Sequence, residues 1–332
     1  MKAETREWKL EDNSSTSIFH PKMLTRRKLL GTLIGAGTAA FGAGTVKSKT
    51  IIADTETKPG KPILGQPVIE WNAHIFSPDT EKYPFHPQAT YQPDVSAQPS
   101  DPLAAYLQRL DKEGIDKAVI VHPEPYGDDH SLIVDCLKRE PERLRGTSLF
   151  YPKDPSASQK LAKLVKEEPL IVSTRFHAHR GKESYLDTFA DAGVRALWQQ
   201  AVDLGLIIEL HIGPSYAKQA GEVIRAIPGS KVLIDHLAEP HLGSAVEFAE
   251  VLELAELPHV YMKLSGLNHF AQDEPLYESA KPFTKRAIEA FGLERMVWGS
   301  GTPKIVDAHM ENYTAEEIAM VKGGNLSQLL DW

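Results

Sequence analysis

Short apolar segments rich in Val, Ile, Leu and aromatic residues recur along the chain from residue 67 onward. Their length and β-branched content are typical of buried strands. Longer stretches between them carry apolar residues at helical spacing, as in 102–113, where Leu103, Tyr106, Leu107 and Leu110 form one stripe. The expected strands are Val68–Phe76, Ala118–His122, Gly146–Tyr151, Ile171–His177, Leu206–Ile212, Lys231–His236, Val260–Leu264 and Met296–Gly299. The expected helices are Pro102–Glu113, Ser131–Lys138, Ala157–Lys166, Ala192–Leu204, Tyr216–Ile227, Ala245–Ala255, Pro282–Phe291 and Ala315–Val321.

This alternation of strands and helices predicts an α/β fold with a parallel sheet. Eight repeats of the unit within about 270 residues favour a closed (β/α)8 TIM barrel. An open, doubly wound sheet is the alternative, but no glycine-rich phosphate loop follows the first strand.

The first 66 residues have a different composition. Arg26 and Arg27 directly precede a short Gly/Ala-rich run, 31–46, a pattern that resembles a twin-arginine export signal. A surface Arg pair ahead of a short helix is the alternative, and the run is marginal for a membrane anchor. We expect a signal region at 1–50, a linker at 51–66 and the barrel domain at 67–332. The signal predicts a periplasmic or otherwise extracytoplasmic protein that meets the membrane only transiently, during export.

Charge and cysteine content exclude several classes of function. The chain carries 37 Lys and Arg against 45 Asp and Glu, a formal net charge of −8, which argues against a nucleic-acid partner. Its single cysteine, Cys136, excludes a disulfide scaffold and a cysteine-rich zinc site. The 13 histidines stand out, because imidazole is a common metal ligand and acid–base group. A small-molecule substrate is therefore the expected partner.

Histidines gather at the predicted strand ends, where the open face of such a barrel carries its chemistry. Because independent structural histidines would scatter over the surface, five at strand ends favour one shared site: His74, His122, His177, His211 and His236. Strand alternation also predicts that Glu70 and Asn72 share a face with His74. Six further histidines are expected in solvated positions: His86, His130, His241, His259, His269 and His309.

Several motifs resemble the amidohydrolase superfamily, in particular its amidohydrolase-2 branch. The matching stretches run in family order: Ile69–His74, Tyr83–Phe85, Thr174–His177, Glu209–Gly213, Ile234–Leu237, Lys263–Leu267, Met296–Ser300 and Gly323–Leu326. Tyr83–Phe85 followed by Thr90–Pro93 is most similar to the subgroup of lactone hydrolases that act on dicarboxylate and sugar-acid lactones. The resemblance implies a TIM barrel and a hydrolase.

The sequence departs from the family pattern at two positions. Asn72 stands where the first strand has a metal-binding histidine, and Gly301 stands where the last strand has an aspartate that ligates metal and moves the proton. The resemblance leaves His74, His211 and His236 as catalytic residues and as ligands for a divalent metal, expected to be zinc. A metal-free scheme is the alternative, as in some lactone-hydrolysing relatives.

The missing aspartate leaves the general base open among Glu124, His122, His177 and Asp307. Arg175 is expected to clamp an anionic substrate group, with Asn72 beside it, because the guanidinium fork pairs with carboxylates. The alternative for Arg175 is an ion pair with Glu209 or Glu70.

The sequence therefore predicts an exported hydrolase acting on a small lactone or ester of a sugar acid or an aromatic-derived acid, with altered or weak metal use. Two alternatives remain open. One is a catalytically silent barrel that binds a ligand, which Gly301 favours. The other is a lyase or isomerase that acts on similar compounds.

Overall fold

The computed structural model describes residues 65–178 and 185–332. The expected signal region at 1–50, and all but the last two residues of the linker at 51–66, lie outside these ranges. Among the described residues, none of the helices combines the length and the apolar character needed to cross a membrane.

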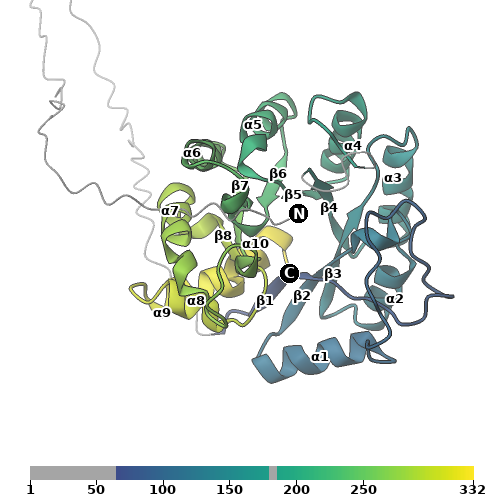
Figure 1. Cartoon of the computed structure of the whole chain (residues 1–332), viewed down its shortest axis with the longest axis horizontal. Coiled ribbons are helices and arrows are strands. Elements are labelled where there is room, and N and C mark those ends of the chain that lie inside the picture. Colours follow the sequence, from purple (N-terminus) through teal and green to yellow (C-terminus); the bar gives the residue numbers. More distant parts are fainter. Residues whose placement is uncertain (1–64, 179–184) are drawn as a thin grey trace, which may run out of the picture. The chain divides into compact units, whose positions relative to one another are not determined.

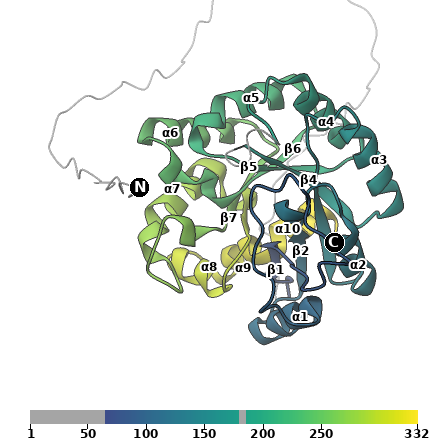
Figure 2. The ribbon, with the colours of Figure 1, turned by 45° about the vertical axis from the view of Figure 1, so that its right-hand side comes forward.

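Eight strands form one parallel sheet in the order β1 to β8, each strand hydrogen-bonded to the next (Figure 1). The helices lie around the outside of the strands, as the turned view in Figure 2 also shows. This arrangement confirms the predicted TIM barrel. The strands are β1 (Ile69–Ala73), β2 (Lys117–Val121), β3 (Leu144–Leu149), β4 (Ile171–His177), β5 (Ile207–His211), β6 (Lys231–Ile234), β7 (Val260–Leu264) and β8 (Met296–Trp298).

The main helices follow the strands in the expected alternation. They are α1 (Pro102–Glu113), α2 (Ser131–Arg139), α3 (Ala157–Glu167), α4 (Ala192–Asp203), α5 (Ala217–Ala226), α6 (Ala245–Glu253), α7 (Lys281–Phe291), α8 (Lys304–His309), α9 (Ala315–Ala319) and α10 (Asn325–Leu330). The sequence pattern did not predict α8 and α10. Each spans only six residues, which is too short for a helical period to show.

The C-terminal segment closes one end of the barrel. Leu326 of α10 packs against Ile69, Val119 and other residues inside the sheet. The Trp332 ring lies against Lys117 and Arg145, whose cationic groups are 4.6 and 4.3 Å from its centroid. These partners lie among the first three residues of their strands. The C-terminal segment therefore covers the amino ends of the strands, and the carboxyl ends lie at the opposite end of the barrel.

A bulge in β1 changes which of its side chains face the barrel interior. Trp71 pairs with Val119, whereas Ala73 pairs with Ile120, so strict alternation is broken at Asn72. Glu70 is buried against α1, where it accepts a hydrogen bond from Tyr106 Oη at 2.7 Å and pairs with Arg109. The prediction that Glu70 shares a face with Asn72 and His74 is therefore wrong.

Candidate active site

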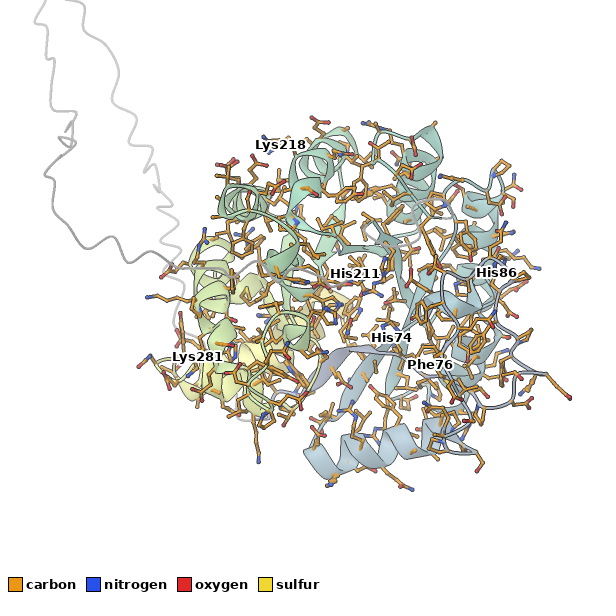
Figure 3. The ribbon with its side chains drawn as sticks, in the orientation of Figure 1. His74, Phe76, His86, His211, Lys218 and Lys281 are labelled. Atoms are coloured by element: carbon orange, nitrogen blue, oxygen red, sulfur yellow. The ribbon has the colours of Figure 1, made fainter. Side chains whose placement is uncertain are left out.

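A pocket opens at the carboxyl ends of the strands. Its volume is about 160 Å³, small for a ligand site. His74 and His211 lie near the middle of the ring of elements in Figure 3, whereas Lys218 and Lys281 lie on its outside. Nine residues line the pocket: Asn72, His74, Tyr91, Glu124, Arg175, His177, His211, His236 and His269. The three histidines proposed as catalytic residues thus reach one cavity.

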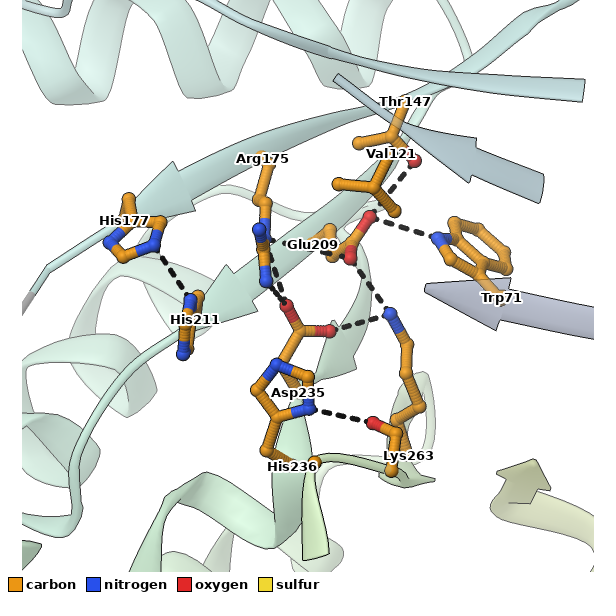
Figure 4. Close-up of polar contacts among 12 residues, drawn as sticks. Trp71, Val121, Thr147, Arg175, His177, Glu209, His211, Asp235, His236 and Lys263 are labelled. Atoms are coloured by element: carbon orange, nitrogen blue, oxygen red, sulfur yellow. Dashed lines mark hydrogen bonds and ion pairs between the residues drawn. The ribbon is translucent and has the colours of Figure 1, made fainter. Parts of the chain in front are cut away.

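Beneath the pocket lies a group of two buried cations and two buried anions, which we call the charge tetrad: Arg175, Glu209, Asp235 and Lys263 (Figure 4). Arg175 donates from Nε and Nη2 to Asp235 Oδ2 at 2.9 and 2.6 Å. Lys263 Nζ lies 2.7 Å from Glu209 Oε1 and 2.6 Å from Asp235 Oδ1. Glu209 Oε2 also accepts from Trp71 Nε1 and Thr147 Oγ1, both at 2.9 Å.

The tetrad changes the interpretation of Arg175. Burial works against the ionised form of Asp235, but Lys263 and Arg175 overcome this effect and lower the pKa of Asp235. The ion pair left open for Arg175 therefore exists, with Asp235 as its main partner and Glu209 Oε1 at 3.7 Å. Glu70 is not a partner, because it pairs with Arg109 on the outside of the barrel. Arg175 still lines the pocket.

His74 enters the pocket as a neutral imidazole. Its Nδ1 lies 2.9 Å from the carbonyl oxygen of Val121, which can only accept, so Nδ1 carries the proton and Nε2 is left as an acceptor. Burial within the protein and the nearby charge of Arg175 lower the pKa of His74 to about 4. His74 is therefore uncharged at neutral pH, although its ring is exposed to the pocket.

A chain of hydrogen bonds crosses the pocket wall from β4 to the loop after β6. His177 Nε2 lies 2.7 Å from His211 Nδ1, and His211 Nε2 donates to Glu239 Oε1 at 2.9 Å. At the other end of the chain, His177 Nδ1 lies 3.7 Å from Glu124 Oε1. Two carboxylates thus flank two imidazoles, an arrangement that can hold or pass a proton.

His236 follows β6 and packs against the loop after β7. Its Nδ1 lies 2.8 Å from Ser265 Oγ. Gly266 has φ +62° and stands so close that an added Cβ would lie 2.5 Å from the imidazole, so a glycine is needed there. Burial, together with the charges of Arg175 and Lys263, holds the pKa of His236 well below its usual value.

Two of the proposed bases lie away from the pocket. His122 is buried against His130, with ring centroids 4.2 Å apart, and its Nε2 donates to the Gly127 carbonyl at 2.9 Å. Asp307 in α8 pairs with Lys322 at 2.7 Å and is half exposed on the surface. Glu124 and His177 remain as the candidates that line the pocket.

The sequence interpretation missed two residues of the site, Glu239 and His269. His269 is exposed to solvent as expected, but it also lines the pocket, and its Nδ1 donates to Glu239 Oε1 at 2.7 Å. His130 was also expected in solvent and is buried instead. No pattern in the sequence marked Glu239, because the turn that positions it contains no glycine.

Comparisons with known proteins place this chain in a family. The amidohydrolase family model matches residues 69–319. The chain belongs to the amidohydrolase family. It is 27% identical over 237 residues to 4-sulfomuconolactone hydrolase of Hydrogenophaga intermedia, covering 69% of this chain and 72% of the relative. It is 25% identical over 219 residues to L-fucono-1,5-lactonase of Burkholderia ambifaria, covering 63% and 70%.

A solved structure supports the same fold. The probable 2-pyrone-4,6-dicarboxylic acid hydrolase of Acinetobacter baumannii, crystallised with citric acid bound, superposes with a TM-score of 0.67 at 20% identity. The match covers 80% of this chain and 99% of that chain. The barrel fold is thus shared over nearly the whole length of that protein.

The backbone at Gly301, where the family pattern has an aspartate, takes a conformation that favours glycine. Gly301 has φ +86°, a conformation that L residues rarely adopt. An added Cβ would lie 2.5 Å from Cδ1 of the buried Ile305. An aspartate at this position would therefore be strained.

Of the three metal ligands that the family pattern implies, only His211 and His236 lie within ligand spacing of each other. Among the described residues, His74 belongs to neither of the two groups whose ligand atoms lie within 4.8 Å of one another. One group, His211, Asp235 and His236, could by its spacing hold an ion. Both oxygens of Asp235 already face cations, however, so coordination there would break the charge tetrad. The implied set of His74, His211 and His236 does not fit a metal.

Proposed function

We propose that this amidohydrolase opens a small lactone that carries an acidic group. The observation that carries the proposal is the narrow pocket in which Arg175, Asn72 and five imidazoles meet at the carboxyl ends of the strands. The two curated relatives described above are both named as lactone hydrolases. An aromatic-derived acid lactone and a sugar-acid lactone are the substrate types that their names suggest.

The size of the pocket and the guanidinium on its wall support a compact anion as substrate. About 160 Å³ lies below the usual range of about 300–1,000 Å³ for drug-sized ligands. Arg175 is the cation on the pocket wall, and the Asn72 amide can donate beside it. His74 adds an acceptor at Nε2, which suits a hydroxyl group of the substrate better than a second carboxylate.

Glu124 and His177 are suited to move the proton. Glu124 Oε1 and His177 Nδ1 lie 3.7 Å apart, so one water beside the pair could contact both atoms. This water would give a proton to the pair as its oxygen adds to the lactone carbonyl carbon. The ring C–O bond then breaks, and the leaving oxygen takes up the proton to give the ring-opened hydroxy acid. His211, 2.7 Å from His177, would hold the imidazole in place.

A panel of small lactones tests this proposal directly. Lactones with and without a carboxylate are incubated with the purified full chain, and acid release is followed with a pH indicator. We expect turnover of the acidic members. Glu124→Gln and His177→Gln should each lower kcat by about 10²–10⁴-fold, whereas the exposed His259→Gln should leave it unchanged. Full activity in both pocket variants would refute the assigned roles.

Gly301 favours a second candidate function, in which the barrel binds a ligand but has no catalytic activity. The loop after β8 cannot present the acid of the family pattern without strain. If one acidic lactone raises the thermal stability of the protein and is recovered unchanged, the binding function replaces the hydrolase.

We also propose that the protein is exported through its twin-arginine signal. The support is the Arg26–Arg27 pair ahead of the Gly/Ala-rich run. Replacing both arginines with lysine should retain the protein inside the cell, as measured by fractionation. Equal amounts outside the cytoplasm for both forms would contradict export by this route.

A further inference from the structure

Glu239 is held in place by an unusual turn. Four successive non-glycine residues, His236 to Glu239, have φ between +50° and +58°. Each costs roughly 1–2 kcal/mol in this conformation. Backbone strain of this kind persists where the surrounding structure enforces it, and it clusters at functional sites. The turn buries the Glu239 side chain behind the pocket histidines, with 1% of its surface exposed.

The carboxylate of Glu239 is surrounded by imidazoles. Its Oε1 accepts from His211 Nε2 and His269 Nδ1, while its Oε2 is buried without a hydrogen-bond partner, 3.6 Å from His241 Nδ1. Among the described residues, the ion-pair partners of Glu239 are these histidines alone. A buried carboxylate oxygen without a donor is costly unless a proton or a cation reaches it.

The charges nearby do not supply that cation. Arg175 and Lys263 are balanced by Glu209 and Asp235 within the charge tetrad. His236 is buried and lines the pocket. Its Nδ1 is held by Ser265, which leaves Nε2 available as a ligand.

We propose that His236, Glu239 and His269 form a binding site for a divalent transition metal of the zinc class. The ligand atoms of the three residues lie within 4.8 Å of one another. Two imidazoles and one carboxylate are a donor set that zinc uses with an open position for water. His236 and His269 line the pocket, so the site can be reached from it.

This site differs from the one that the family pattern implies, because it uses the loops after β6 and β7 and does not need His74. Asn72 and Gly301 then no longer count against metal binding, since neither belongs to the new ligand set. The proposal concerns metal binding alone and does not depend on the hydrolysis proposed above.

Metal binding by the full chain tests the proposal without any activity assay. Protein stripped with a chelator is titrated with Zn²⁺ in a calorimeter and with Co²⁺ in a spectrophotometer. We expect one equivalent to bind, with the visible absorption of a low-coordinate Co²⁺ site. His269→Gln and Glu239→Gln should each weaken binding by more than about 100-fold, the upper range for losing a residue that merely supports a ligand. His74→Gln and His259→Gln should bind as the parent does.

The variants also separate this site from the alternatives. His269 is partly exposed, with 29% of its side chain accessible, so His269→Gln should fold even if Glu239→Gln does not. Thermal melting of the metal-free proteins checks this point. Binding far below one equivalent in the parent would overturn the proposal. Loss of binding in His74→Gln with retention in His269→Gln would overturn it as well, in favour of the family position.

Discussion

The charge tetrad makes a sharp prediction about stability, because its four side chains balance one another inside the barrel. Lys263→Met removes a fully buried ammonium that contacts Glu209 Oε1 at 2.7 Å and Asp235 Oδ1 at 2.6 Å. Arg175 then faces two carboxylates, and the group carries a net charge of −1. Breaking a buried ion pair from one side typically costs about 3–5 kcal/mol, and we expect that loss in the free energy of unfolding.

A second substitution tests whether charge balance is the cause. Glu209→Gln keeps the shape of the side chain and an oxygen that can accept from Trp71 and Thr147, but it leaves the group with a net charge of +1. With both substitutions, only the neutral pair of Arg175 and Asp235 remains. The double variant should therefore lose less stability than the sum of the single variants, by about 1–3 kcal/mol.

Urea unfolding of the four proteins measures these differences. The urea concentration at the midpoint of unfolding should decrease in the variants. The slope of the unfolding free energy against urea concentration should change little, since the surface exposed on unfolding stays the same. The reasoning would be refuted if the stability losses of the two single variants simply add up in the double variant. A loss below about 1 kcal/mol in the unfolding free energy of Lys263→Met would refute it as well.

Two further predictions concern single residues. Burial lowers the pKa of His122 to about 4, so the unfolded chain binds a proton below about pH 6.5 that the folded protein binds only near pH 4. His122 alone should lower the free energy of unfolding by about 3 kcal/mol as the pH decreases across that window. In urea titrations at several pH values, His122→Gln should remove this part of the fall. Gly301→Asp should lower stability by about 1–3 kcal/mol because of its φ of +86° and its contact with Ile305. Gly301→Ala should lose a similar amount of stability. If either variant melts at the same temperature as the parent, the backbone at position 301 is not strained by a side chain.

The barrel could be predicted from the sequence because each strand is a short apolar run between amphipathic helices. Position at a strand end also located most of the pocket, since His74, His177, His211 and His236 all line it. His122 shows the limit of that reasoning. It too follows a strand, but its ring packs against His130 and donates a hydrogen bond to the Gly127 carbonyl. His122 does not line the pocket.

Two local features of the backbone explain what the sequence did not reveal. The bulge at Asn72 breaks the alternation of β1 and sends Glu70 to the outer face. The left-handed turn at His236–Glu239 contains no glycine, so no residue type in the sequence indicates such a turn. The partners of Glu239 come from β5 and from the loop after β7, and only the fold brings them together.

The most direct test of the proposed function is to identify the product when an acidic lactone is incubated with the full chain. NMR spectra of the mixture distinguish the closed ring from the open hydroxy acid. We predict complete conversion to the hydroxy acid at a rate well above that of the buffer, and slow conversion with His177→Gln. A lactone that binds to the protein but stays closed for as long as it does in buffer would contradict the assignment of this pocket as a hydrolase site.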